Sequence, residues 1–523
     1  MKADELPKGF GNHWVEKAGV RNIQLGLILA LIAYSISILI TSDHVGVSKY
    51  IRFLILLPLF LAGVVGRFDL FFLAFRSWLV WLFFGLQVVL WSVNIYREYY
   101  SLHFNYYDTG FFWNPISNFA AGKGFYNSEI QASEFADHFC PGLLVFSPLA
   151  NWFQDGTVLI VVRLIGYILS FWLLRLLLRF HEVEKGLSHF ILFMWVTSFG
   201  VTNFMGFEFQ SSNLIVPLVF ALFLSWQKKQ WWISGLLMLV ILSLKENGSL
   251  VILSLGMFAF FYLKQRWQGI VLVGTGTFLF WFIPVVLMPY LAGTANLNTT
   301  SIQLFANPLI KARFAFQVFL CSGLLICFHP KALLVVLPTM AVSFLLNRSG
   351  AQTMAFHYQD IPLAVSFAVF GFLASKARSG ISGLIPGFPG ASILATFGVL
   401  AGMYANKYSV TNFLVYHTPT ENTKAAVQAM HRFRNERMPG KTVHAQPDLA
   451  FYDSGNPKIR CLMNVDVALS DISPNYIVLC DASANHWPIG EAYESLKTRL
   501  LQEVASGKRR QRVEYLPLLV FEK

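Results

Sequence analysis

The stretch that decides the fold is WLVWLFFGLQVVLWSVNIYREYYSLHFNYYDTGFFW, residues 78–113. Its first half, residues 78–95, is an apolar run long enough for a helix that crosses the roughly 30 Å hydrocarbon core of a bilayer. Its second half is polar and aromatic and contains Asp108. The change from a membrane helix to a polar loop predicts a chemically active segment at one face of a membrane.

The same alternation of apolar block and polar joint runs through most of the chain. About thirteen apolar blocks lie between residues 23 and 406, each a candidate spanning helix. Of the 523 residues, 55% are hydrophobic and 13% are charged, whereas roughly a quarter of residues are charged in a soluble domain. Backbone groups in lipid must bond internally, so these blocks are predicted to be helices. We therefore expect an α-helical polytopic membrane protein with about 13 transmembrane helices.

Lysine and arginine gather in alternate joints of this pattern. They include Arg175 and Arg179, Lys228 and Lys229, Lys264 and Arg266, Lys331, and Lys376. The positive-inside rule places these joints and the basic N-terminus in the cytoplasm, which leaves the long loop of residues 96–155 outside. Lys245 and the pair Lys311 and Arg313 are exceptions, because they fall in outside joints. The net charge of +12 follows from the same rule, and no basic stripe with interleaved aromatics favours a nucleic-acid partner.

The patterning changes after the last apolar block. Residues 1–405 form the predicted membrane domain, and residues 406–523 a small extracytoplasmic α/β domain. Helices are expected at residues 422–436 and 490–504, and strands at residues 442–445, 476–480 and 513–521. A supporting or acceptor-binding role is expected here. Cys461 and Cys480 either form a disulfide or remain buried thiols.

The polar residues that suggest chemistry all fall in joints predicted to lie outside. They are Asp108, Asp137 and His138, Glu208, Lys245 and Glu246, Arg348, and His357 and Tyr358. The shared side predicts one extracytoplasmic active site at the membrane surface.

Each of these positions also has a plainer interpretation. Desolvation among aromatics makes Asp108 a candidate general base or metal ligand, and a helix cap within an aromatic belt fits equally well. Asp137 and His138 suit a divalent ion or a phosphate, or simply a loop turn. Lys245 suits a phosphate, or neutralises its neighbour Glu246.

Two further joints carry the same ambiguity. Glu208 lies between two phenylalanines, which is a costly placement unless the carboxylate has a partner or faces water. A simple helix–helix turn is the alternative there. His357 and Tyr358 open an apolar block, where an N-cap with an aromatic anchor is the plainer interpretation. Arg348 adds an outside cation that could meet a phosphate.

The order of these motifs resembles a family of prokaryotic membrane proteins known as domain of unknown function 2079. The motifs are Asp108-Thr109-Gly110-Phe111-Phe112, Gly122-Lys123-Gly124-Phe125, Asp137-His138-Phe139, Ser147-Pro148-Leu149, Glu208-Phe209-Gln210-Ser211, Lys245-Glu246-Asn247 and His357-Tyr358. The resemblance covers roughly residues 106–375. Gln210 stands where the family pattern has a histidine, and Asn247 where it has an aspartate.

The family in turn resembles integral-membrane glycosyltransferases of the C-type (GT-C) fold. That resemblance implies a sugar donor carried on a polyprenyl phosphate, an acceptor of unknown identity, contact with membrane lipids, and a location in the inner membrane. It implies catalytic roles for Asp108, Asp137, His138 and Glu208, with a divalent cation (Mg or Mn) bound by the first three. Substrate contacts are implied for Lys245, Glu246, Arg348, His357 and Tyr358.

Two other functions fit the sequence. The first is a transporter or flippase for a lipid-linked or anionic solute, for which the intramembrane Lys245 and Glu246 are typical. Transporters, however, place such charges near the midplane in repeated broken helices, and no repeat is visible here. The second is a non-catalytic scaffold for envelope assembly, which the altered positions Gln210 and Asn247 favour.

Overall fold

The computed structural model describes residues 77–104, 106–294, 306–322, 325–345, 358–376, 418–462, 474–482 and 492–523. The first two predicted helices and the last one lie outside these residues, as do the joint at 377–417 and the predicted domain boundary at 405. Arg348 and His357 also lie outside the described residues. The division into domains 1–405 and 406–523 therefore stays a prediction.

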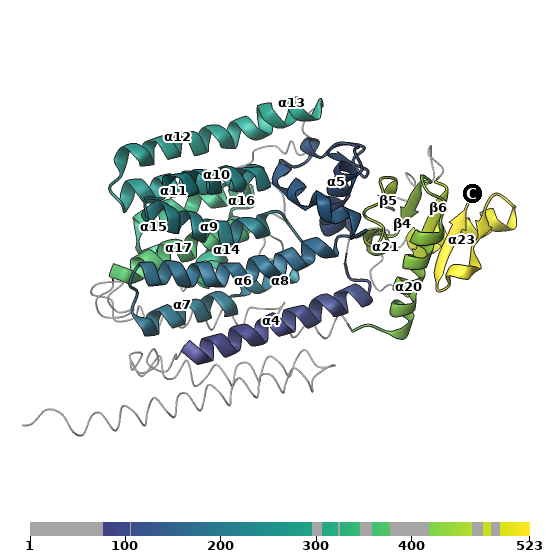
Figure 1. The fold of residues 1–523 in the computed structure, drawn as a ribbon, viewed down its shortest axis with the longest axis horizontal. Helices are drawn as coiled ribbons and strands as arrows, with labels where there is room; N and C mark the ends of the chain where they lie inside the picture. Colours follow the sequence, from purple (N-terminus) through teal and green to yellow (C-terminus); the bar gives the residue numbers. More distant parts are fainter. Residues whose placement is uncertain are drawn as a thin grey trace, which may run out of the picture.

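The described membrane part is a bundle of apolar helices that run side by side (Figure 1). Three of its helices are long and apolar enough to cross a membrane: α4 (Ser77–Tyr100), α6 (Thr157–Phe180) and the stretch Arg266–Ala292. A fourth span results if the bent pair Lys185–Thr197 and Gly200–Gly206, with an angle of 42°, counts as one. The remaining apolar helices are shorter, so the count of about thirteen spans stays a prediction.

The long stretch Arg266–Ala292 consists of α12 (Arg266–Phe282), a π-helical turn at Ile283–Leu287 and α13 (Met288–Ala292). The shorter bundle helices are α7 (Lys185–Thr197), α8 (Phe199–Gly206), α9 (Ser212–Gln227), α10 (Trp231–Leu244), α11 (Ser249–Phe261), α14 (Pro308–Cys321), α15 (Pro330–Val336), α16 (Ala341–Leu345) and α17 (Asp360–Lys376). Helices α11 and α12 approach closely through glycines: a Cβ on Gly256 or Gly276 would meet backbone atoms of the other helix at 2.7 and 2.6 Å. Small residues at such crossings are typical of membrane helices.

The basic joints lie together at one end of the bundle, which we call the basic end. The Lys228 ammonium at the end of α9 lies over the Phe180 ring at the end of α6, 5.7 Å from its centroid. Trp226 Nε1 donates to Gln265 Oε1 at 2.9 Å, which joins α9 to the start of α12. The Arg175 guanidinium lies 5.1 Å from the Trp81 ring of α4. The predicted alternation of the joints is thus reproduced across these helices.

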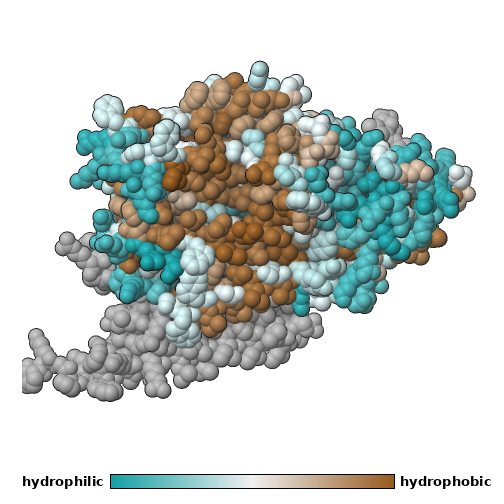
Figure 2. Space-filling view, viewed as in Figure 1, coloured by the Kyte–Doolittle hydropathy of each residue, from teal (hydrophilic) through white to brown (hydrophobic). Residues whose placement is uncertain are grey.

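Polar surface covers both ends of the bundle, with an apolar belt between them (Figure 2). Exposed apolar side chains of α10 and α12 contribute to the belt, among them Leu239 at 66% exposed and Val271 at 63%. Such an apolar surface is costly in water and suits a lipid environment.

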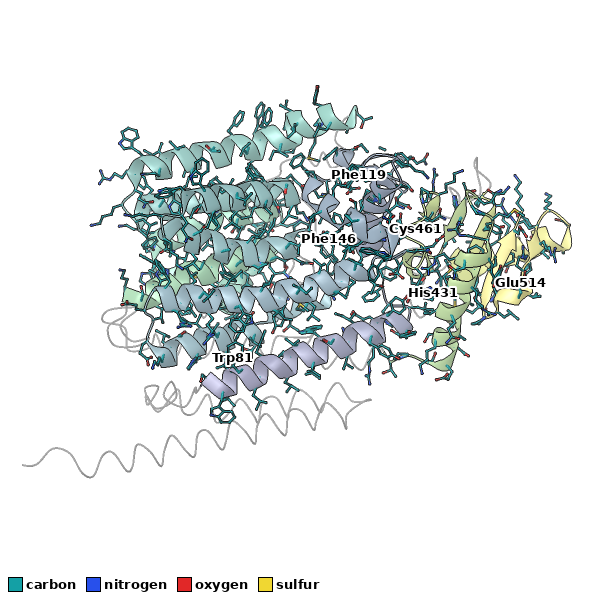
Figure 3. The ribbon with its side chains drawn as sticks, in the orientation of Figure 1. Trp81, Phe119, Phe146, His431, Cys461 and Glu514 are labelled. Atoms are coloured by element: carbon teal, nitrogen blue, oxygen red, sulfur yellow. The ribbon has the colours of Figure 1, made fainter. Side chains whose placement is uncertain are left out.

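The opposite end of the bundle carries the outer segment, residues 101–156. It contains a π-helical turn (Tyr106–Gly110), α5 (Phe111–Ala120), the short pair β1 (Tyr126–Asn127) and β2 (Ala132–Ser133), and 3-10 helices at Glu134–Ala136 and Pro141–Asn151. The apolar block that begins at Pro141 is therefore a separate short helix, too short to span a membrane. Figure 3 shows Phe119 and Phe146 of this segment between the bundle and the C-terminal sheet.

The C-terminal residues form a five-stranded sheet in the order β5-β4-β6-β8-β7. Its strands are β4 (Val443–Ala445), β5 (Ile459–Cys461), β6 (Tyr476–Cys480), β7 (Arg510–Gln511) and β8 (Leu518–Glu522), and its helices are α20 (Glu421–Glu436), α21 (Pro447–Phe451) and α23 (Ala492–Ala505). Strands β5, β4 and β6 are parallel, and β8 is antiparallel to both of its neighbours. The predicted helices and two of the predicted strands are confirmed. The predicted strand 513–521 is wrong in its first half, where Val513–Tyr515 is a 3-10 turn.

Cys461 and Cys480 are buried free thiols. They lie on β5 and β6, and β4 runs between these two strands. Strands two positions apart are separated by roughly 9–10 Å, which exceeds the Cα separation of about 7 Å that a disulfide tolerates. The structure thus favours the thiol interpretation over the disulfide.

The C-terminal sheet is anchored to the outer segment by a continuous polar seam. Asn114 Nδ2 donates to the carbonyl oxygens of Ser454 and Asn456 at 2.9 and 3.0 Å. The Cys461 amide donates to Glu129 Oε2 at 2.8 Å. Arg434 pairs with Asp155 at 3.8 Å. The seam holds the sheet beside the π-helical turn that carries Asp108.

Candidate active site at the outer end of the bundle

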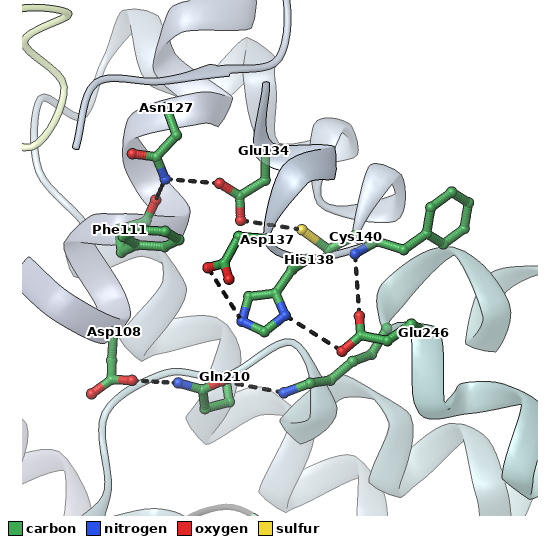
Figure 4. A network of polar contacts seen from close by, with 11 residues as sticks. Asp108, Phe111, Asn127, Glu134, Asp137, His138, Cys140, Gln210 and Glu246 are labelled. Atoms are coloured by element: carbon green, nitrogen blue, oxygen red, sulfur yellow. Dashed lines mark hydrogen bonds and ion pairs between the residues drawn. The ribbon is translucent and has the colours of Figure 1, made fainter. Parts of the chain in front are cut away.

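A chain of hydrogen bonds connects Asp108 to Lys245 (Figure 4). Gln210 Nε2 donates to Asp108 Oδ1 at 2.5 Å, and Lys245 Nζ donates to Gln210 Oε1 at 3.4 Å. Asp108 belongs to the π-helical turn, Gln210 to the joint between α8 and α9, and Lys245 to the end of α10. The neutral amide of Gln210 therefore bridges a carboxylate and an ammonium from segments far apart in the sequence.

Burial raises the pKa of Asp108 to about 6, although Lys245, Gln210 and His138 all lower it. A carboxyl group with a pKa near 6 is ionised at neutral pH and yet retains useful basicity. This is the property that the sequence predicted from an aspartate among aromatic residues. The helix-cap alternative for Asp108 has no support, because α5 begins at Phe111 without a side-chain cap.

A second cluster joins Asp137, His138 and Glu246. His138 Nε2 lies 3.7 Å from Asp137 Oδ2, and His138 Nδ1 lies 3.4 Å from Glu246 Oε1. The Phe139 amide donates to Glu246 Oε2 at 3.1 Å, and the His138 ring stacks on Phe112 with centroids 5.7 Å apart. Burial lowers the pKa of His138, but Asp137 and Glu246 outweigh it and raise the pKa to about 9. His138 is therefore an imidazolium at neutral pH, flanked by two carboxylates.

Glu134 is a site residue that the sequence analysis did not single out. It is fully buried, accepts a 2.7 Å hydrogen bond from Asn127 Nδ2, and lies 3.9 Å from the Cys140 sulfur. Burial raises its pKa to about 8. Its position in the sequence, three residues before the Asp137-His138-Phe139 motif, was the available signal.

Glu208 points into the protein and fixes the position of the Asp108 turn. Its carboxylate accepts a hydrogen bond from the Thr109 hydroxyl, and that hydroxyl also accepts from the Phe209 amide at 3.0 Å. The buried Arg163 of α6 interacts electrostatically with Glu208. Glu208, which lies between two phenylalanines, thus has the polar partners that its position requires. This geometry suits a positioning role, and a catalytic role for Glu208 stays a prediction.

The first turn of α17 contributes another carboxylate. Asp360 Oδ2 accepts hydrogen bonds from Ser212 Oγ and Asn213 Nδ2, each at 3.0 Å. Asn213 Oδ1 in turn accepts a hydrogen bond from the backbone N–H of Gln210 at 2.8 Å. Asp360 thereby ties α17 to the joint that carries Gln210. The neighbouring Tyr358 is half-buried, and its predicted substrate contact stays a prediction, like those of Arg348 and His357.

The predicted metal ligands do not form a metal site in the described part of the chain. No group of three or more histidine, cysteine, aspartate and glutamate side chains is placed to hold an ion there. His138 is engaged on both sides by Asp137 and Glu246, and a protonated imidazole has no free electron pair for a metal. Asp108 bonds to Gln210 instead. The divalent cation stays a prediction, and no step below depends on it.

The convergence of these residues matches the prediction of one common site. Asp108, Asp137, His138, Lys245 and Glu246 come from two joints, the loop of residues 96–155 and the joint at Lys245, and they lie together at this end of the bundle. Glu208 contacts the Asp108 turn through the Thr109 hydroxyl. Gln210, Glu134 and Asp360 join the network without having been predicted as site residues.

The crystal structure of ArnT from Cupriavidus metallidurans bound to undecaprenyl phosphate is similar to this chain, with a TM-score of 0.48 and 10% sequence identity. The similarity covers 85% of this chain and 98% of ArnT. No curated protein matches the chain significantly. The model of the predicted membrane protein family DUF2079 matches residues 98–450, a range that includes Asp108, the outer segment, Lys245 and, of the C-terminal sheet, strand β4. The chain belongs to this family of predicted membrane proteins.

Proposed function

We propose that the chain is an integral-membrane glycosyltransferase of GT-C type, with about 13 transmembrane helices, that takes a sugar from a polyprenyl-phosphate carrier. The N-terminus lies in the cytoplasm, and the site faces the outside of the inner membrane. The observation that carries this proposal is the network from Asp108 through Gln210 to Lys245 at the end of the bundle away from the basic joints. In this network one amide bridges a base and a cation, which supports a site for a lipid-linked phosphate.

The proposed reaction is a single displacement at the anomeric carbon. The acceptor hydroxyl oxygen forms the new bond, the bond from the anomeric carbon to the phosphate oxygen breaks, and Asp108 takes the hydroxyl proton. The departing polyprenyl phosphate keeps the electron pair, and the Lys245 ammonium offsets its negative charge. His138 adds a second positive charge on the same side of the site.

The test is transfer by the purified protein in lipid nanodiscs, given a panel of polyprenyl-phosphate sugars. Asp108→Asn keeps the size and the hydrogen bond to Gln210 but removes the base, and Lys245→Met removes the charge. Both variants should lose transfer by a factor of about 100 or more, while Lys264→Met at the basic end should not. If no donor supports transfer and donor binding does not depend on Lys245, the proposal fails.

One observation favours a transporter as second candidate. The bent pair α7 and α8 resembles the broken helices in which transporters place their binding sites. Counter-flow in vesicles distinguishes the two functions: saturable, Lys245-dependent uptake without transfer supports transport.

A further inference from the structure

A pocket lies at the seam between the outer segment and the C-terminal sheet, and no predicted site residue lines it. Its volume is about 400 Å³. The outer segment contributes Lys123 and Gln154 to its wall, and the C-terminal part contributes Arg437, Asp453 and Lys458. A pocket of this size accommodates a monosaccharide with an attached anionic group.

The charge of this pocket is positive. Asp453 is the one carboxylate among the described residues that line it, and this carboxylate accepts hydrogen bonds from Arg437 Nη2 at 2.8 Å and Asn456 Nδ2 at 2.9 Å. The Arg437 side chain is only 10% exposed, and its Nε has no hydrogen-bond partner among the described residues. Lys458 Nζ donates to the carbonyl of Gly440 at 2.7 Å. Both residues line the pocket, so this hydrogen bond holds the ammonium at the pocket wall. Two lysines and an arginine thus face one paired carboxylate.

The motif Gly122-Lys123-Gly124-Phe125 has no part in the proposed active site, and the position of Lys123 gives it a role. Lys123 stands between Gly122 and Gly124, whose φ angles are +73° and +71°. These left-handed conformations favour glycine. The turn is closed by a hydrogen bond from the Lys123 amide to the Asn118 carbonyl at 2.9 Å. The Gly-Lys-Gly turn therefore presents a lysine to this pocket.

One wall of the pocket also touches the segment that carries Asp108. The Gly455 amide donates to the Gln154 carbonyl at 2.9 Å within the pocket wall. The neighbouring Ser454 packs against Gly110, where an added Cβ would lie 3.3 Å from the Ser454 Cβ. A ligand in the pocket would therefore rest on residues that contact the Asp108 turn.

We propose that this pocket binds the phosphate or carboxylate group of an anionic acceptor. Lys123, Arg437 and Lys458 supply charge-assisted hydrogen bonds to that group. The acceptor assignment rests on the proposed transferase function, whereas the binding of an anion by the pocket does not. The acceptor is either a soluble sugar phosphate or an anionic lipid headgroup, which present the same chemistry.

The test measures binding of glucose 1-phosphate to the purified full chain in phosphatidylcholine nanodiscs by calorimetry. Glucose 1-phosphate should bind, and glucose should not. The double variant Lys123→Gln/Lys458→Gln should weaken binding at least about tenfold. The matched control Lys508→Gln/Arg432→Gln removes two exposed charges outside the pocket and should leave affinity unchanged. A melting curve for each variant confirms that it is folded.

The second arm repeats the titration in nanodiscs that contain phosphatidylglycerol. Loss of glucose 1-phosphate binding in these nanodiscs, where the lipid headgroup competes for the pocket, identifies a lipid-borne acceptor. Unchanged binding identifies a soluble one. Equal affinity for glucose, or no effect of the double variant, overturns the anion site. Asp108→Asn should keep glucose 1-phosphate binding, so a failure of transfer with any donor sinks the transferase proposal and leaves the pocket standing.

Discussion

The cluster of Asp137, His138 and Glu246 makes the stability of the protein depend on pH in a defined direction. The pKa of His138 rises from its ordinary value of 6.5 to about 9 in the folded protein. A group whose pKa is raised on folding stabilises the fold fully below its unfolded pKa, and this contribution is lost as the pH rises through the folded pKa. The stabilisation should therefore be complete below pH 6.5 and disappear between pH 6.5 and about 9.

The magnitude follows from the size of the pKa change. Each pKa unit corresponds to about 1.4 kcal/mol, so the rise to about 9 corresponds to about 3 kcal/mol. The three side chains keep 19–24% of their surface exposed, which makes this figure an upper bound. A loss of this order lowers Tm by a few degrees in a chain of this size.

Tryptophan fluorescence during heating measures Tm of the detergent-solubilised protein between pH 6 and 10. Wild type should lose Tm across the window from 6.5 to 9, and His138→Gln should start lower and lose less. Glu246→Gln should reduce the pH dependence in part, because Asp137 remains. His189→Gln on α7 is the matched control. Equal pH dependence in wild type and His138→Gln would refute the reasoning.

Four further predictions concern the site and the seam. Transfer should be lost as the pH falls through about 6, since Asp108 must be ionised to act as a base, and a pH–rate profile measures this. Gln210→Leu removes a hydrogen bond that lowers the pKa of Asp108, so the same profile should move to higher pH. Thr109→Val should cost about 1–3 kcal/mol by leaving Glu208 without its hydroxyl partner, and a melting curve should show Thr109→Ser close to wild type. Asp155→Asn removes the ion pair with Arg434 and should lower Tm in the same melting curves.

The sequence predicted that the candidate site residues and the basic joints lie at opposite ends of the bundle, because this depends on the alternation of charged joints along the chain. The face of the membrane at which the site lies stays a prediction. The basic end of the bundle contains Arg175, Lys228 and Lys376. The opposite end contains Asp108, His138 and Lys245. A spanning helix reverses the side of each successive joint, so the order of joints is enough to group these residues.

The partners within the site could not be predicted in the same way. Gln210 drew attention only as a departure from a motif, whereas its amide bridges Asp108 and Lys245. The rotation of each helix about its axis decides such contacts, and side-chain packing between helices sets that rotation. The contacts of the seam could not be predicted either. Asn114 bonds to Ser454 and Cys461 bonds to Glu129, and each pair is more than 300 positions apart in the sequence.

The central claim is that residues from separate joints share one outer site at the end opposite the basic joints. Side-specific labelling with a membrane-impermeant maleimide tests it directly, using single cysteines in a cysteine-free background. Asp137→Cys and Glu246→Cys should both label only from the outside of intact cells, and Lys228→Cys and Lys264→Cys only after the membrane is opened to the cytoplasmic side. Labelling of Asp137→Cys and Glu246→Cys from opposite sides would contradict the account.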